Sequence, residues 1–221
     1  MKRISWAVSM LFLLLVANHM GAQPLGGSGP RFYSEFKPVV GGWSKYQMAA
    51  SGQQPWKMKI AVVGKEGDAY WYETVMEGGK RGSVVTKMLV SGNPEDQKNI
   101  KRMIVKQGNE PAMEMPVQMM GQSPKGQGQT GKVIDKGTET IKVPAGTFKA
   151  QHSQYRDAEG IVDTWICKDV SPYGMIKSVS NDTEMVLIAY GTEAKTQITE
   201  TPQKFEMPQM PQIPERRPRR K

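Results

Sequence analysis

The sequence predicts a mainly β protein: a curved antiparallel sheet or unclosed half-barrel of about nine or ten strands, with a helix on its concave side. Two observations carry this prediction. Apolar and polar residues alternate along most of the chain after Trp43, which is the period of a half-buried strand. Short turn sequences separate the alternating segments, and short turns join antiparallel neighbours. One segment, 94–107, departs from this period and has the pattern of a helix.

The chain begins with the pattern of an exported protein. Lys2 and Arg3 precede an apolar run over 6–17, and two small residues follow at 21–22. This order predicts a signal peptide over 1–22, and the run is shorter than the ~20 residues that span a bilayer. An uncleaved membrane anchor is the alternative. We therefore expect a periplasmic or secreted protein.

Four segments are expected along the chain: the signal peptide, a linker with a short N-terminal helix over 23–42, a β domain over 43–200, and a tail over 201–221. The linker is rich in glycine, proline and serine, and Pro30 suits the first position of a helix. No composition break divides the β domain. Its length is sufficient for one domain with a sizeable core.

The tail has the composition of a disordered basic segment. Proline recurs at every third position over 208–214, which favours an extended chain that builds no core. The formal charge of the whole chain is +9. Much of it lies in the tail, so the body is only weakly basic and no nucleic-acid partner is expected. The tail is expected either to be solvated or to contact an anionic envelope surface through Arg216, Arg217, Arg219, Arg220 and Lys221.

The first half of the β domain contains three clear strands. Trp56, Met58 and Ile60 share one face of the first of them, and lysines occupy the other face. Turn residues then lead into an aromatic-rich strand that carries Tyr70 and Tyr72, as in an antiparallel hairpin. The three expected strands cover 56–62, 69–75 and 83–90.

The helix predicted over 94–107 rests on a start signal and an apolar stripe. Asn93 is a favourable N-cap and Pro94 suits the first helical position. The stripe consists of apolar residues at i, i+3 and i+4, followed by basic residues near the C-terminus. A strand over 100–106 is the alternative. The stripe is formed by Ile100, Met103 and Ile104.

The second half of the β domain is predicted to form further hairpins. Alternating segments are joined by short turns, including a tight turn at Lys136–Gly137. All of them therefore extend the antiparallel sheet. The expected strands cover 132–135, 138–143, 148–155, 161–169, 174–179 and 185–190.

Three motifs of the second half carry a resemblance to a known family. Val-Pro-Ala-Gly-Thr-Phe over 143–148 is followed by Asp-Thr-Trp-Ile over 163–166 and by Val-Ser-Pro-Tyr-Gly-Met-Ile-Lys over 170–177. This succession resembles bacterial exported domains of unknown function that are related to the LolA/LolB-like superfamily of periplasmic lipoprotein carriers. The resemblance implies a half-barrel with a hydrophobic cavity beneath a helix, used to bind acyl chains, and it implies no catalytic residue.

We expect an exported, non-catalytic protein that holds a lipophilic ligand or a lipid-modified partner, without a cofactor. The alternative is a structural or interaction module of the cell envelope that acts through its basic tail. The sequence alone does not separate residues that line a cavity from residues that pack a core. The candidates for either role are Trp56, Met58, Ile60, Tyr70, Tyr72, Ile100, Met103, Ile104, Phe148 and Trp165.

A methionine-rich segment leaves a third possibility open. Thioethers are soft ligands for Cu(I), so copper handling is conceivable in a cell envelope. The competing interpretation is a methionine-lined strand that fills a core or an adaptable cavity. The weak metal candidates are Met113, Met115 and Met119.

Nothing in the sequence is a positive sign of an enzyme. Cys167 is the only cysteine, which excludes an intramolecular disulfide, and His152 is the only histidine beyond the predicted signal peptide. If the turn before Ile161 spans 157–160, His152 faces Trp165 across a hairpin and Cys167 is its diagonal neighbour. This face is expected to be apolar, and a buried cysteine there would behave as an inert hydrophobe.

Overall fold

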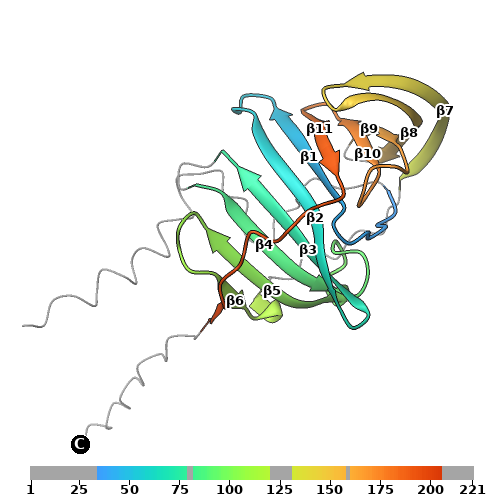
Figure 1. Ribbon diagram of the computed structural model, residues 1–221. Helices are drawn as coiled ribbons and strands as arrows, with labels where there is room; N and C mark the ends of the chain where they lie inside the picture. The colour runs from blue at the N-terminus through green and yellow to red at the C-terminus, as the bar shows by residue number, and fades with distance from the viewer. Residues whose placement is uncertain (1–33, 79–81, 120–130, 158–159, 206–221) are drawn as a thin grey trace, which may run out of the picture.

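A computed structural model describes residues 34–78, 82–119, 131–157 and 160–205, and these residues form one twelve-stranded sheet (Figure 1). The strands are β1 (Trp43–Ala50), β2 (Trp56–Glu66), β3 (Ala69–Glu77), β4 (Val84–Val90), β5 (Ile100–Gln107), β6 (Met113–Met115), β7 (Lys132–Val143), β8 (Gly146–Asp157), β9 (Gly160–Ile166), β10 (Met175–Val179), β11 (Thr183–Gly191) and β12 (Gln203–Lys204).

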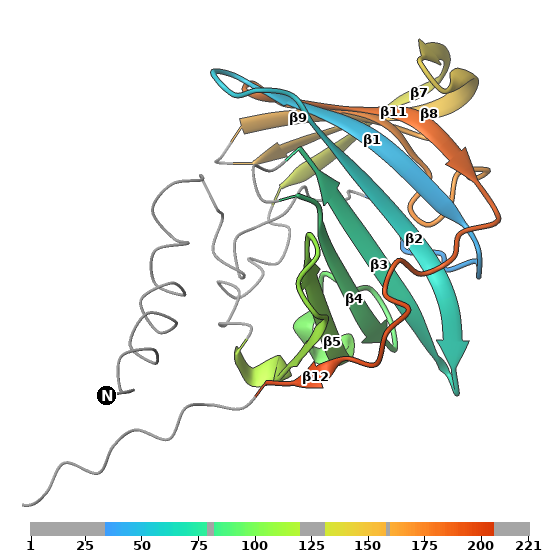
Figure 2. The same ribbon diagram turned by 60° about the vertical axis from the view of Figure 1, so that its left-hand side comes forward.

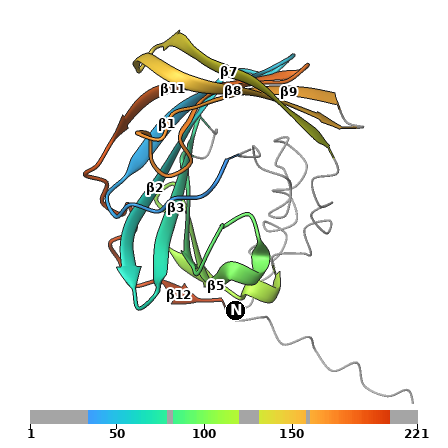
Figure 3. The same cartoon turned by 90° about the vertical axis from the view of Figure 1, so that its right-hand side faces the viewer.

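The sheet consists of two antiparallel meanders joined through β1 and β11. Its order is β12-β6-β5-β4-β3-β2-β1-β11-β10-β9-β8-β7. All neighbours are antiparallel except β12, which pairs with β6 in parallel. Figures 2 and 3 show the sheet curving, so that β7–β9 lie over one end of the wall made by β2–β5. The predicted fold class, a curved and unclosed antiparallel sheet, is confirmed, with twelve strands in place of nine or ten.

Helix contributes almost nothing to the described residues. These contain two three-residue 3-10 turns, η2 (Gln97–Asn99) and η3 (Val117–Met119). No helix among them has the length and apolar character needed to cross a membrane.

The predicted helix over 94–107 is wrong, and the alternative strand is correct. The residues expected to start the helix form a tight turn instead, in which the Asp96 side chain accepts a hydrogen bond from the backbone N–H of Lys98. The i, i+3 spacing has a different cause. The register shifts between Leu89 and Val90, so that β5 carries a bulge near its start. A bulge adds one residue to a strand, which lets Ile100 and Met103 share a face although they are three residues apart.

The hairpin turn predicted at Lys136–Gly137 is also wrong. β7 continues through these residues, and the register against β8 shifts between Asp135 and Gly137. Gly137 has a φ of +86°, a conformation that favours glycine, so the turn-like dipeptide forms a bulge within an edge strand. The hairpin turns later, at 144–145, between β7 and β8.

The two segments that flank the predicted β domain, 23–42 and 201–221, also differ from expectation where the structure describes them. Residues 34–42 contain a bend and a turn but no helix, and the rest of the expected short helix lies outside the described residues. Of the predicted tail, residues 201–205 lie within the described residues, and the last of these is Phe205. Its backbone N–H donates to the carbonyl of Glu114 at 3.1 Å, which extends the β12–β6 pairing. Residues 206–221 of the predicted tail lie outside the described residues.

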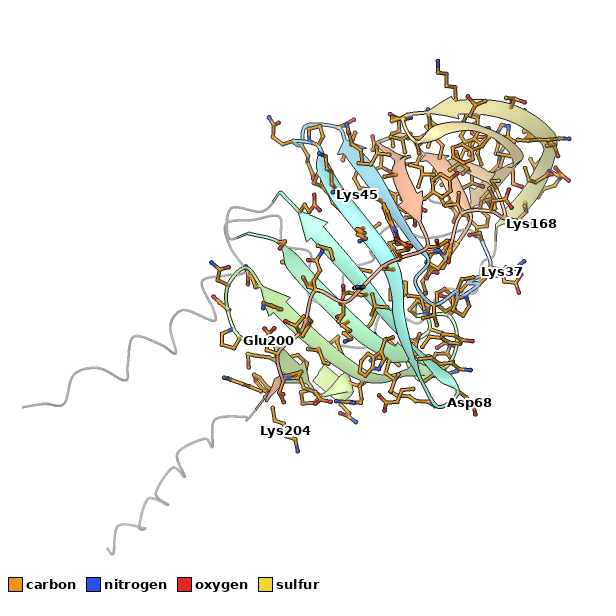
Figure 4. All side chains as sticks on the ribbon, in the orientation of Figure 1. Lys37, Lys45, Asp68, Lys168, Glu200 and Lys204 are labelled. Carbon is orange, nitrogen blue, oxygen red and sulfur yellow. The ribbon has the colours of Figure 1, made fainter. Side chains whose placement is uncertain are left out.

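Residues 192–205, which we name the strap, cross the outer face of the sheet from β11 to β6 (Figure 1; Glu200 and Lys204 are labelled in Figure 4). Glu73, on β3 beneath the strap, anchors it to the sheet. Glu73 is 2% exposed, and its carboxylate accepts from the Thr196 hydroxyl at 2.6 Å and from the Gln197 backbone N–H at 3.1 Å. Ile198 follows as an apolar contact, and Lys106 pairs with Glu200 at 2.5 Å.

Two apolar clusters lie on opposite faces of the β2–β5 wall because successive strand residues point to opposite sides. The smaller cluster lies under the strap and contains Val75, Val85, Ile104, Ala112 and Ile198, with Trp71 packed against it. The larger cluster occupies the other face and extends to the strands of the second meander. The strap therefore covers the outer face, while the larger cluster defines an inner face.

An ion pair ties β5 to the short strand β6. Arg102 donates to Glu114 with an Nε–Oε1 distance of 2.7 Å, and this hydrogen bond holds the pKa of the Glu114 carboxyl below its usual range. We expect Glu114→Gln to lower the free energy of unfolding by at most about 1 kcal/mol at pH 7, since the pair is partly exposed.

The pH dependence of that cost follows from the lowered pKa. The stabilisation is present above the pKa of Glu in the unfolded chain, ~4.3, and is lost as the pH falls through the lower pKa of the folded state. Urea unfolding of the parent protein and of Glu114→Gln should be measured from about pH 7 to about pH 2, a range that brackets both pKa values. The difference between their free energies of unfolding should shrink towards zero as the pH falls. A difference that grows on acidification would contradict this assignment.

Candidate functional site

The inner face of β1–β6 is the candidate binding surface. Its residues follow from the strand register. One row runs from Val62 through Tyr72 on β3 to three methionines on β4, β5 and β6. The next row carries Ile60 together with Thr74 and Thr86. The register places four uncharged polar side chains among the apolar residues of this surface, Ser44, Thr74, Thr86 and Gln107. Lys65 lies at its edge, 5.5 Å from the centre of the Tyr70 ring, whereas Lys57, Lys59 and Lys87 alternate onto the outer face.

The structure places nine of the ten predicted cavity or core candidates in the large cluster or directly against it. The exception is Ile104, which is 4% exposed but lies on the outer face under the strap. The predicted helix put Ile104 beside Met103, whereas neighbours in a strand point to opposite faces. The buried candidates in the large cluster are Met58, Ile60, Tyr72, Ile100, Met103 and Phe148, and the half-buried ones packed against it are Trp56, Tyr70 and Trp165.

The inner face is not completely covered. Large apolar side chains at its border remain partly accessible, and Met76 is 43% exposed. The half-buried apolar residues next to the buried cluster include Val105 and Val117. A fully packed core would leave such residues buried, so the inner face presents accessible apolar surface at its edges.

Aromatic rings close one end of the inner face. Phe36, from the segment before β1, packs edge-on against Tyr72 with 5.8 Å between ring centroids, and lies 5.4 Å from the ring of Tyr173. Further along, the Tyr46 hydroxyl donates to the carbonyl of Met175 at 3.1 Å. Burial raises the pKa of Tyr46 and of Tyr72 well above the usual range. These phenols therefore stay neutral and place no charge in the site.

Methionine takes the place that leucine usually holds on this surface. The chain has 16 methionines, whereas Leu89 and Leu187 are the only leucines after residue 30. Leucine is normally among the commonest residues of globular domains. Unbranched thioether side chains adapt to irregular shapes, so a face lined by them can accept partners of differing outline. The methionines of the large cluster are Met48, Met58, Met88, Met103, Met175 and Met185, with Met115 packed against it.

The three weak metal candidates occupy different environments. Met113 on β6 is 36% exposed and pairs with Val105, whereas Met115 is half-buried and pairs with Met103. Met119 is the last residue of η3. Within the described residues, no group of three or more histidine, cysteine, aspartate or glutamate side chains is arranged to hold a metal ion.

His152 is held between two carboxylates. It faces Trp165, as the hairpin register predicted, and the two rings stack with centroids 4.4 Å apart. Nδ1 lies 3.0 Å from Glu139 and Nε2 lies 2.8 Å from Asp163. Because both ring nitrogens are engaged, His152 does not act towards Cys167, whose Sγ lies 3.8 Å from a carboxylate oxygen of Asp169.

Sequence reasoning missed the two carboxylate partners of His152. Glu139 belongs to β7 and Asp163 to β9, and β8 lies between them in the sheet. The pairing of three strands brings these carboxylates to His152, and no local sequence motif predicts that contact. A correct prediction of β7 as one continuous strand would have placed Glu139 opposite Ala150, beside His152.

Comparisons with known proteins identify no family. No family model matches the chain, and no curated protein matches it. Solved structures give weak likenesses. MucB in complex with MucA(peri) has 9% sequence identity and a TM-score of 0.44, covering 77% of this chain and 54% of that one. MucB alone has 10% identity and a TM-score of 0.42, covering 75% and 55%. This chain thus spans about half the length of the MucB chains.

A third likeness is an exported protein with a YmcC-like fold from Bacteroides fragilis, at 12% identity and a TM-score of 0.36, covering 72% of this chain and 99% of that one. Likenesses of this strength carry no inference about function. What the structure shares with the fold expected from the sequence is the single, curved and unclosed sheet.

Proposed function

We propose that this protein is an exported, non-catalytic binding protein of the cell envelope, which holds a lipophilic ligand or a lipid-modified partner on the inner face of β1–β6. The observation that carries the proposal is the accessible apolar border of that face. Trp56, Tyr70 and Met115 remain half-buried beside a buried cluster, and Met76 is 43% exposed. Each buried methylene group contributes about 0.8 kcal/mol, so an acyl chain gains affinity from such a surface.

The chemistry of the face supports an apolar ligand over a polar one. Ser44, Thr74 and Thr86 are the polar side chains of the central row, and none of them carries a charge. The tyrosines at the closed end are neutral. A carboxylate, phosphate or ammonium group placed on this face would lose its hydration and gain no counter-ion, which is costly. A hydrocarbon chain meets no such cost.

Extraction of the purified envelope form into organic solvent, with mass spectrometry of the extract and native mass spectrometry of the intact protein, tests the proposal. We expect a lipid that co-purifies at close to one molecule per chain, as one continuous face predicts. A protein that stays free of lipid after incubation with envelope lipids would overturn the proposal. It would favour the interaction module that acts through the basic tail.

A further inference from the structure

The strand register aligns three methionines side by side. Met88 on β4 lies opposite Met103 on β5, and Met103 lies opposite Met115 on β6. Met88 and Met103 are 9% and 4% exposed, and Met115 is half-buried against the same cluster. We name these three residues the methionine row. The row was not visible in the sequence, because its members are 15 and 12 positions apart and belong to three strands.

We propose that the methionine row is a binding site for a soft monovalent cation, Cu(I) or Ag(I), held by three thioether sulfurs. Adjacent strands lie about 4.8 Å apart, and directly opposite side chains have Cβ atoms about 5 Å apart. Met103 is the central member, so each outer methionine is one strand away from it. Figure 3 shows that the sheet is curved, and side chains on the concave face of a curved sheet lean towards one another. Methionine also has three rotatable bonds, which adapt the position of its sulfur. The three sulfurs can therefore approach one ion.

The surroundings of the row select a soft ion. The neighbouring side chains are apolar: Val90, Ile100 and Val105 belong to the same cluster or pack against it. Hard divalent ions require carboxylate, carbonyl or water oxygens, and thioether ligands select Cu(I) among the common metals. A monovalent ion bound by neutral sulfurs also leaves a single positive charge to bury. Met115, the half-buried member, provides the accessible end of the row.

This site differs from the methionine-rich segment that the sequence indicated, in which Met113 is exposed. It includes Met115 but replaces Met113 and Met119 by two buried methionines of neighbouring strands. The exposed Met113 pairs with Val105, so it belongs to another row. Variants at Met103 and at Met113 therefore distinguish the methionine row from the segment that contains Met113.

Titration of the purified protein with Ag(I), which needs no reductant, tests the site. All proteins carry Cys167→Ser, because a free thiol binds the same ion more strongly than a thioether. Met103→Leu removes the central ligand with little change of volume, and such exchanges usually cost less than ~1.5 kcal/mol of stability. Met185→Leu is the matched control, since Met185 is equally buried at 4% in the same cluster but lies on β11, outside the row.

We expect one Ag(I) per chain by native mass spectrometry, with sulfur-only coordination by X-ray absorption. Met103→Leu should weaken binding by at least about tenfold, whereas Met185→Leu should change it less than about twofold, because only the first removes a ligand. Absence of binding to the parent protein, or equal binding by the two variants, would overturn the proposal. A larger loss in Met113→Leu than in Met103→Leu would also overturn it and would assign the ion to the exposed segment. Circular dichroism and thermal unfolding verify the fold of each variant.

Discussion

Replacement of Glu73 by alanine is expected to lower the free energy of unfolding by about 3 kcal/mol, because hydrogen bonds to a charged group contribute roughly 1.5–3 kcal/mol and the donors left behind lose their acceptor. Glu73 is 2% exposed, and its carboxylate accepts hydrogen bonds from the Thr196 hydroxyl and the Gln197 backbone N–H. Its loss also releases the strap, so that Ile198 no longer covers the outer apolar cluster. Urea denaturation gives the free energy directly.

Glu77→Ala is the matched control for this prediction. Glu77 lies on the same strand and the same face as Glu73, but its side chain is 39% exposed and pairs with Lys45 at 2.9 Å. An exposed ion pair contributes at most about 1 kcal/mol. Hydrogen exchange at the Gln203 amide, which donates to the carbonyl of Ala112, reports whether the strap has detached. Equal destabilisation by both variants, with the strap still protected, would show that Glu73 does not anchor it.

The second large effect is expected for Thr86→Glu, which places a carboxylate in the middle of the proposed binding face. Thr86 lies opposite Val105 and beside Thr74, among half-buried side chains. Burying an unpaired charge costs several kcal/mol, and every 1.4 kcal/mol is tenfold in affinity, so binding of a fluorescent fatty-acid probe should weaken by at least about tenfold.

Lys87→Glu controls for the change of charge. Lys87 is the next residue on β4 and points to the outer face, where its ammonium lies 4.9 Å from the centre of the Trp71 ring. The two variants therefore introduce the same side chain on the same strand at opposite faces. Lys87→Glu should leave probe binding within about twofold and lose only the cation–π contact of about 1 kcal/mol. Comparable losses of binding in both variants would place the ligand elsewhere.

The sequence determined the fold class because its signals are local. Alternation along 56–62 fixes which side of β2 is buried, and the register shows Met58 and Ile60 on the apolar face as predicted. The same alternation on β8, with a short turn behind it, was sufficient to set His152 opposite Trp165. Each of these predictions needs only a two-residue period and a turn length, both of which are written in consecutive residues.

Only the tertiary structure decided the features that depend on bulges and on partners far away in the chain. A bulge at the start of β5 gave Ile100 and Met103 the spacing of a helix, and a bulge at Gly137 gave β7 the appearance of a turn. The methionine row depends on the register of three strands, and the anchoring of the strap depends on a contact between Glu73 and residues more than 120 positions later. Such contacts are set by how strands pair across the sheet, and no stretch of neighbouring residues contains that information.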